Sequence, residues 1–249
     1  MLFGTVKVGE IPRVIAAIDG ENTKEKLFKA RELKVDLIEA RIDLLKEINE
    51  ETIENFLDII ADFGFYCVAT IRPIWEGGKC TLPEEKRFNL FSKLINHPSV
   101  AAIDIELRAT EIIKRVVTLT SGSGKKTIIS YHDFQKTPEK KSLTEIFSKA
   151  KSLSADIVKC AFKANSYRDI AAVSSTIMEI EIPKIFMLMG EKGSISRLDS
   201  FIFGSLLSYT FLDKAVAPGQ IEAKELINLL IRFYPEYRKR KFLTLKGEL

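Results

Sequence analysis

Short apolar runs rich in β-branched residues alternate with amphipathic helical patterns along almost the whole chain. A run that is apolar at nearly every position is typical of a parallel strand buried on both faces, and apolar positions three and four residues apart indicate a helix. The predicted strands cover residues 14–19, 37–43, 66–72, 100–107, 127–133, 156–162, 184–190 and 209–217. The predicted helices cover residues 23–34, 49–63, a segment that begins near Pro83, a segment from Thr110 to the turn at 121–124, and residues 142–153, 166–178, 194–206 and 223–233.

Eight strand–helix pairs predict one α/β domain, a single (β/α)8 TIM barrel. A doubly wound open sheet is the alternative, but such sheets usually have fewer strands. The 249 residues suit one barrel, and no linker rich in proline, glycine or serine divides the chain. We therefore expect residues 1–233 to form the barrel domain and residues 234–249 to form a basic C-terminal extension.

The composition, with 46% hydrophobic and 29% charged residues, provides for a large core and argues against a disordered chain. No apolar run reaches the roughly 18 residues that a membrane span needs, and the N-terminus lacks the order of a signal peptide. The three cysteines are scattered, as is usual in a reducing compartment. We expect a cytoplasmic protein with no membrane partner.

The net charge of +4 is confined to the C-terminal end of the chain. From Arg232 onward there are six basic and two acidic residues, out of 38 and 34 in the chain, so residues 1–231 are neutral overall. A neutral barrel does not indicate a nucleic-acid partner. The basic segment 238–241 favours a solvated terminus, and contact with an anionic partner is the alternative.

Charged and polar residues interrupt the predicted strands near their carboxyl ends. Because side chains alternate along a strand, Glu39, Arg41 and Asp43 share one face. The carboxyl ends of barrel strands meet at one mouth, where barrel enzymes carry their catalytic groups. So many desolvated charges favour an active site over unrelated buried ion pairs. The other residues of this kind are Arg72, Asp104, Glu106, Ser130, His132 and Lys159.

Lys159 lies among small and apolar residues in the run 157–162. Burial and neighbouring cations both lower the pKa of a lysine, and a neutral amine attacks ketones to form Schiff bases. The alternative is a structural lysine in an ion pair with Glu39 or Glu106. The cations expected near the amine are Arg41, Arg72 and Arg197.

His132 is suited to proton transfer near neutral pH, and Glu76, in the loop after the third strand, is its expected orienting partner. The segment 190–197 predicts a loop that enters a helix with Ser194 as its N-cap. A helix N-terminus beside Arg197 suits an anion such as a carboxylate. Ordinary capping, with Arg197 pointing to solvent, is the alternative.

Three other kinds of site do not match the sequence. The segment 122–127 lacks the first glycine of a phosphate-binding loop and precedes a strand instead of following one. No dinucleotide-binding glycine pattern follows the first strand, and two histidines without a Cys-x-x-Cys pair do not indicate a zinc site. We therefore expect neither a nucleotide-binding loop of these two kinds nor a zinc site.

Several short motifs occur in order, each at a predicted strand end. They are Glu39-Ala-Arg41-Ile-Asp43, Thr70-Ile-Arg72 followed by Glu76-Gly-Gly, Ser130-Tyr-His132-Asp-Phe, Asp156-Ile-Val-Lys159-Cys-Ala, Met187-Leu-Met189-Gly leading to Ser196-Arg197-Leu, and Ala217-Pro-Gly-Gln220. Each motif is weak alone. Together, from about Pro12 to Phe233, they resemble the type I 3-dehydroquinate dehydratases, which are Schiff-base enzymes of the shikimate pathway.

The resemblance implies a lyase that dehydrates 3-dehydroquinate to 3-dehydroshikimate on the way to aromatic amino acids. It implies that Lys159 forms an imine with the C3 ketone, and that His132 removes the C2 proton and returns one to the departing C1 hydroxyl. Glu76 would orient His132. The resemblance also implies a homodimer without metal or organic cofactor. The implied substrate-binding residues are Glu39, Arg41 and Arg72 for the ring hydroxyls, and Arg197 and Gln220 for the carboxylate.

Two positions, Ala17 and Val216, depart from the family's usual serine, so we expect altered affinity or loop closure with the chemistry intact. Another Schiff-base barrel enzyme, of the aldolase or transaldolase type, is the first alternative, but it does not need His132 together with the arginines. A non-catalytic ligand-binding barrel is the second, and it is expected to lack Lys159 or His132.

Overall fold

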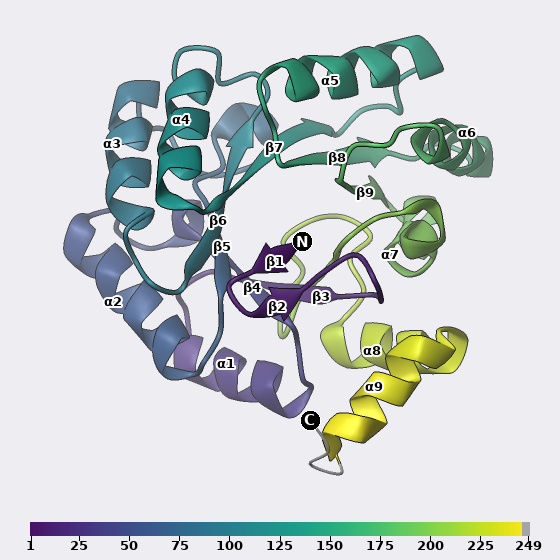
Figure 1. Cartoon of the computed structure of the whole chain (residues 1–249), viewed down its shortest axis with the longest axis horizontal. Helices are drawn as coiled ribbons and strands as arrows, with labels where there is room; N and C mark the ends of the chain where they lie inside the picture. Colours follow the sequence, from purple (N-terminus) through teal and green to yellow (C-terminus); the bar gives the residue numbers. More distant parts are fainter. Residues whose placement is uncertain (246–249) are drawn as a thin grey trace.

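Eight parallel strands form one sheet that curves into a barrel (Figure 1). The computed structural model describes residues 1–245, and the side chains of residues 1–241. Neighbouring strands pair in parallel, β10 returns to β3, and a bridge between Lys184 and Ser205 joins β9 to the segment before β10. The predicted (β/α)8 barrel is therefore confirmed. The strands are β3 (Val14–Ile18), β4 (Leu37–Arg41), β5 (Cys67–Thr70), β6 (Val100–Glu106), β7 (Lys126–Asp133), β8 (Ile157–Lys163), β9 (Lys184–Met189) and β10 (Ser208–Thr210).

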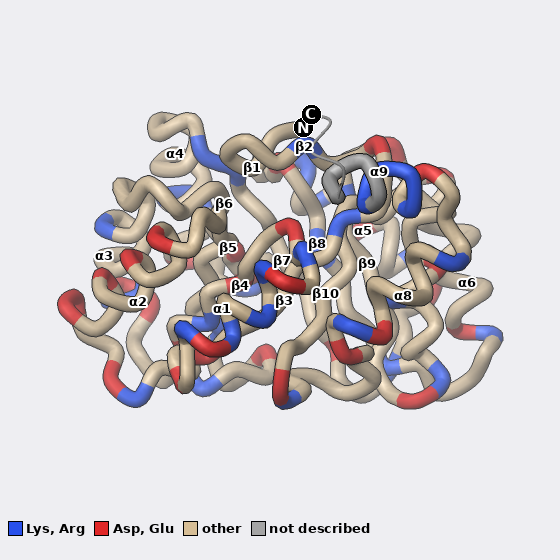
Figure 2. Tube along the Cα trace, turned by 90° about the horizontal axis from the view of Figure 1, so that it is seen from below, with Lys and Arg blue, Asp and Glu red and all other residues tan. Residues whose placement is uncertain are grey.

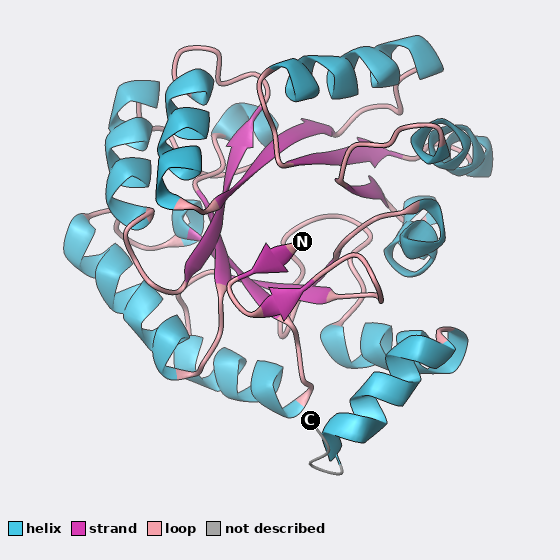
Figure 3. Ribbon diagram, viewed as in Figure 1, coloured by secondary structure: helices cyan, strands magenta, loops and turns pink. Residues whose placement is uncertain are grey.

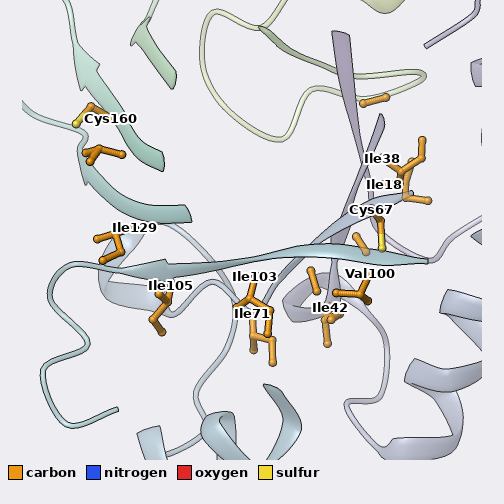
Figure 4. Packing of buried hydrophobic residues seen from close by; sticks show 14 of the residues in the cluster. Ile18, Ile38, Ile42, Cys67, Ile71, Val100, Ile103, Ile105, Ile129 and Cys160 are labelled. Carbon is orange, nitrogen blue, oxygen red and sulfur yellow. The ribbon is translucent and has the colours of Figure 1, made fainter. Parts of the chain in front are cut away.

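Helices surround the barrel and cover the outer face of the sheet (Figure 3). They are α1 (Thr23–Glu32), α2 (Glu50–Asp62), α3 (Glu84–Leu94), α4 (Ile113–Ser123), α5 (Lys140–Ser152), α6 (Tyr167–Met178) and α8 (Ala223–Phe233). Their apolar sides pack on the outward side chains of the strands, among them Ile38 and Ile103, in one continuous core (Figure 4). Within residues 1–245, no helix has the length and apolar composition to cross a membrane.

A hairpin covers the end of the barrel at which the strands begin. Its strands, β1 (Leu2–Phe3) and β2 (Val6–Lys7), pair antiparallel and lie across that end (Figure 1). Phe3 is fully buried in an apolar cluster with Ile15 and Leu37, which lie close to the starts of β3 and β4. The sequence pattern does not predict this hairpin, because strands of two residues are too short to show alternation.

The last strand is shorter than predicted. β10 ends at Thr210, whose hydroxyl donates to the carbonyl of Ile221. The backbone N–H groups of Val216 and Ala217 donate to Oε1 of Gln220, which holds the rest of the predicted strand as a loop. The apolar residues between 211 and 217 therefore lie in a loop rather than in a strand.

The predicted helix at 194–206 is three short turns, η3 (Lys192–Ile195), α7 (Ser196–Asp199) and η4 (Ser200–Phe203). The N–H of Leu188 donates to the Ser196 hydroxyl and ties the second turn to β9. Ser194 is not an N-cap, because it lies inside η3 and donates to the carbonyl of Glu191.

The C-terminal extension contains a helix, α9 (Pro235–Leu245), which packs beside α8 (Figure 1). Tyr237 is only 1% exposed and joins the apolar core. Arg238, Lys239 and Arg240 are exposed, as expected for a solvated basic segment. Figure 2 shows α9 at the same end of the barrel as β1 and β2. The remaining tail, 246–249, lies outside the described residues.

The domain division after residue 233 stays a proposal, and the folding of a chain truncated there would test it.

Candidate active site

One pocket at the carboxyl ends of the strands contains every residue to which the family resemblance gives a catalytic or substrate-binding role. The strand register explains this convergence: Glu106, Ser130 and Lys159 are level on β6, β7 and β8, and the other polar side chains lie on neighbouring strands or in the loops that follow them. The predicted residues that line the pocket are Glu39, Arg41, Arg72, Glu76, His132, Lys159, Arg197 and Gln220.

Lys159 is buried and makes two ion pairs, which contradicts the prediction of an unpaired amine with a lowered pKa. Its Nζ lies 3.1 Å from Oε1 of Glu39 and 3.0 Å from Oδ2 of Asp104, and 3.9 Å from the centre of the Tyr209 ring. Burial alone would lower the pKa of the lysine, but the two carboxylates outweigh it and raise the pKa above its ordinary value. The alternative of an ion pair was right for Glu39 and wrong for Glu106.

Arg72, rather than Lys159, forms the ion pair with Glu106. Its Nη1 donates to Oε1 of Glu106 at 2.6 Å and to the Ser130 hydroxyl at 2.7 Å, and its Nη2 pairs with Oδ1 of Asp104 at 2.7 Å. Arg72 and Lys159 together hold the pKa of Asp104 well below its usual range in spite of burial. Arg72 and Lys159 are therefore coupled through one shared carboxylate.

Sequence reasoning missed two members of this network. Asp104 was recognised as a strand polar group but not as a partner of the lysine, although it shares a face with Glu106. Arg87, on α3, is 1% exposed and reaches through the barrel wall to pair with Glu106 at 2.5 Å and with the carbonyl of Ile71 at 2.8 Å. No sequence signal identifies Arg87, because its helix carries several charged residues that are exposed.

Replacing Arg87 with methionine is expected to lower the free energy of unfolding by about 3–5 kcal/mol, because a buried carboxylate loses one of its two cations. Denaturant unfolding of the Arg87→Met variant measures this loss. Arg115→Met is the matched control, since it removes an exposed pair with Glu85 that contributes little. Equal, small losses for both variants would show that Glu106 does not depend on Arg87.

His132, which is half-buried, pairs with the buried carboxylate of Glu76. Its Nδ1 lies 2.8 Å from Oε2 of Glu76, which follows β5 in the short turn η2 (Ile74–Glu76), and its ring stacks near Phe134. Burial raises the pKa of Glu76 to about 8. Burial, followed by the charges of Arg72 and Lys159, holds the pKa of His132 well below its ordinary value. The imidazole is therefore neutral near neutral pH, as a general base must be.

Arg197 points into the pocket rather than to solvent, so the alternative of an exposed arginine is wrong. It is 1% exposed, and its Nη1 contacts the sulfur of Met187 at 2.8 Å. Its Nε and Nη2 are buried without a hydrogen-bond partner among the described residues, and burial lowers its pKa to about 10. A buried cation with two unused donors is a strong candidate to bind a carboxylate.

Arg41 and Gln220 are both fixed by local contacts. Arg41 donates through Nε and Nη2 to Asp43, at 2.8 and 2.7 Å. Oε1 of Gln220 accepts a hydrogen bond from the N–H of Val216, a loop residue that also lines the pocket.

Among residues 1–245, no group of three or more His, Cys, Asp or Glu side chains is arranged to hold a metal ion.

A buried amine, a histidine–carboxylate pair and an unpaired arginine at the mouth of a (β/α)8 barrel define a barrel enzyme that acts on an anionic substrate. A family model described as type I 3-dehydroquinase matches residues 14–234. The chain belongs to this family.

Named relatives and solved structures agree with this assignment. A 3-dehydroquinate dehydratase from Hydrogenobaculum is 38% identical over 89% of this chain and 99% of its own length. One from Methanocaldococcus jannaschii is 41% identical over 83% of this chain and 92% of its own length. The crystal structure of the Aquifex aeolicus 3-dehydroquinate dehydratase matches with a TM-score of 0.82 at 35% identity, over 89% of this chain and 99% of that chain.

Proposed function

We propose that the chain dehydrates 3-dehydroquinate to 3-dehydroshikimate through a Schiff base on Lys159, as a lyase of the shikimate pathway to aromatic amino acids. The observation that supports this most is the placement of Lys159, His132 and Arg197 around one pocket. An amine, a neutral imidazole and an unpaired cation suit a ketone, an acidic C–H and a carboxylate on one small molecule.

The ion pairs of Lys159 suggest how the amine is activated. In the free enzyme the amine is protonated, so it must first pass a proton to Asp104 or Glu39, both about 3 Å away. The neutral amine then attacks the C3 ketone, the carboxyl group that took the proton returns it to the departing oxygen, and loss of one water leaves a protonated imine. The imine withdraws electrons from C2 and acidifies its proton.

His132 then serves as base and acid in turn. It accepts the proton from C2, the electron pair forms the C1–C2 double bond, and the C1–O bond breaks. The proton held by His132 goes to the departing hydroxyl, which leaves as water. Addition of water to the imine releases the product and restores the amine of Lys159.

The arginines and Gln220 position the substrate. Arg197 supplies Nε and Nη2 to the carboxylate, and the amide of Gln220 lies in the same pocket. Asp43 fixes Arg41 so that it presents Nη1 to a ring hydroxyl, and Glu39 and Arg72 contact the others. An aldolase-type reaction does not require this set.

The rate is expected to depend on the proton shared by His132 and Glu76. The pair holds this proton below about pH 8, the pKa of Glu76, and releases it above, so kcat/KM rises with pH, is half its limit near pH 8 and levels off above that. In Glu76→Gln only His132 still titrates in the pair, and burial and the nearby cations keep its pKa below the ordinary value of 6.5. The rise of kcat/KM is therefore expected to move to a pH below 6.5. A pH profile unchanged by this substitution would exclude the pair as its source.

Two further proposals come from the family resemblance. The protein works in the cytoplasm without metal or organic cofactor, and it forms a homodimer. Light scattering of the purified protein is expected to give twice the mass of one chain. A mass equal to that of one chain at the concentrations used for activity would contradict the dimer.

A further inference from the structure

A second pocket lies at the end of the barrel opposite the candidate active site, under the helix α9. Its walls are the hairpin region near Thr5 and Ile11, the segment 34–36 before β4, and α9 itself. The pocket has a volume of about 350 Å³. Because the family model ends at residue 234, α9 and the wall it provides lie outside the matched region.

The lining of this pocket is strongly basic. Its charged members are the cations Arg13, Lys34, Arg240 and Lys241 and one carboxylate, Asp36. Both oxygens of that carboxylate already accept hydrogen bonds: Oδ1 from Nη1 of Arg13 at 2.8 Å and Oδ2 from the N–H of Val14 at 2.9 Å. Among the side chains of residues 1–241, neither Lys34 nor Lys241 forms an ion pair with a carboxylate, so the lining holds positive charge that Asp36 does not balance.

Two groups in the wall show the consequences of this imbalance. Burial lowers the pKa of Lys241 to about 8, and its ammonium has only the carbonyl of Lys34 as an acceptor among the hydrogen bonds of the described residues. Within the part of the chain whose side chains are described, the buried hydroxyl of Tyr237 has no hydrogen-bond partner, which is a costly state for a polar group. Both groups favour an added acceptor that carries negative charge.

We propose that this pocket binds a small, multiply charged anion, a phosphate ester or a polycarboxylate, through Arg240 and Lys241 of α9 together with Arg13. The site does not share residues with the catalytic pocket, and its ligand is distinct from the substrate. Tyr237 also lines the pocket, so its hydroxyl is available to donate to the anion. Charge-assisted hydrogen bonds to guanidinium and ammonium groups provide the affinity.

Titration calorimetry of the full chain with pyrophosphate, and separately with citrate, tests the proposal. At least one of the two is expected to bind with a stoichiometry of one per chain. Tighter pyrophosphate binding identifies the phosphate-ester class, and tighter citrate binding identifies the polycarboxylate class. Absence of saturable binding for both at millimolar concentrations would overturn the proposal.

Two double variants of α9 distinguish binding in the pocket from non-specific attraction to the basic surface. Arg240→Gln/Lys241→Gln is expected to weaken binding by about tenfold or more. The matched control, Arg238→Gln/Lys239→Gln, removes the same charge from exposed positions outside the pocket and is expected to change binding by less than about threefold. Equal losses in both variants would indicate a diffuse basic surface, of the kind that binds nucleic acid, and would overturn the proposal.

Two single variants complete the test. Tyr237→Phe, which keeps the packing and removes the hydroxyl, is expected to weaken binding about fivefold. Arg197→Met changes the catalytic pocket alone and is expected to leave binding of the added anion unaltered. Loss of binding in Arg197→Met would place the anion at the catalytic pocket and contradict the second site.

Discussion

Replacing Lys159 with methionine is expected to lower kcat for dehydration by at least about 10⁴-fold, the scale of loss seen when a covalent nucleophile is removed. Methionine fills a similar volume but forms no imine, so the electron sink that acidifies the C2 proton is lost. The measurement is the rate of appearance of the conjugated product with the variant at saturating substrate.

The same variant also loses an ion-pair partner of two buried carboxylates, Glu39 and Asp104, so a stability effect must be separated from a chemical one. Lys159→Arg is the control, because it retains a cation beside Glu39 and Asp104 but cannot form a Schiff base. We expect it to fold with cooperative unfolding and to be as inactive as Lys159→Met. Substantial turnover by either folded variant would remove the lysine from the mechanism.

Replacing His132 with alanine is expected to reduce kcat/KM by at least about 10²-fold, since one side chain both accepts the C2 proton and protonates the leaving hydroxyl. The imine on Lys159 still forms in this variant, more slowly, so covalent trapping persists while turnover fails. Steady-state kinetics and trapping on the same sample separate the two steps.

The chain's other histidine provides the control for this prediction. His97 contacts Ser99 and Asp58 outside the catalytic pocket, so His97→Ala is expected to keep near-normal kcat/KM. If His132→Ala retained near-normal turnover as well, another group would have to move the proton.

The barrel and the membership of the candidate site could be predicted from the sequence because both depend on local patterns. Each strand carries an apolar run, and period-two alternation places Glu39 with Arg41 on one face. Closure of the barrel then brings strand ends such as those of Arg72 and Lys159 together, although they are far apart along the chain. For Glu39, Arg41 and Lys159 the position near a strand end was enough to place the residue in the pocket. Gln220 lies in a loop, and only the family resemblance indicated it.

The electrostatic state of the site could not be predicted in the same way. The apolar neighbours of Lys159 in sequence suggested a low pKa, but its neighbours in space are Glu39 and Asp104 from other strands, which raise it. Whether burial or ion pairing dominates depends on distances of about 3 Å across the barrel, which no run of adjacent residues specifies.

The parts of the fold that were missed depend on single hydrogen bonds or on long-range packing. The loop after β10 is held by the Gln220 side chain, and the turn at Ser196 is fixed by its bond to β9. The helix α9 is anchored by Tyr237, an aromatic residue next to the basic segment 238–241. Hydropathy patterns do not register contacts of this kind.

Borohydride trapping tests the central claim most directly. Incubation of the protein with 3-dehydroquinate and borohydride, followed by intact-mass and peptide analysis, is expected to show one substrate-derived adduct per chain on Lys159. The adduct is a secondary amine formed by hydride addition to the imine, so it requires borohydride and is absent from Lys159→Met. An unchanged mass in folded protein that turns over the substrate, or an adduct on a different lysine, would contradict the proposed mechanism.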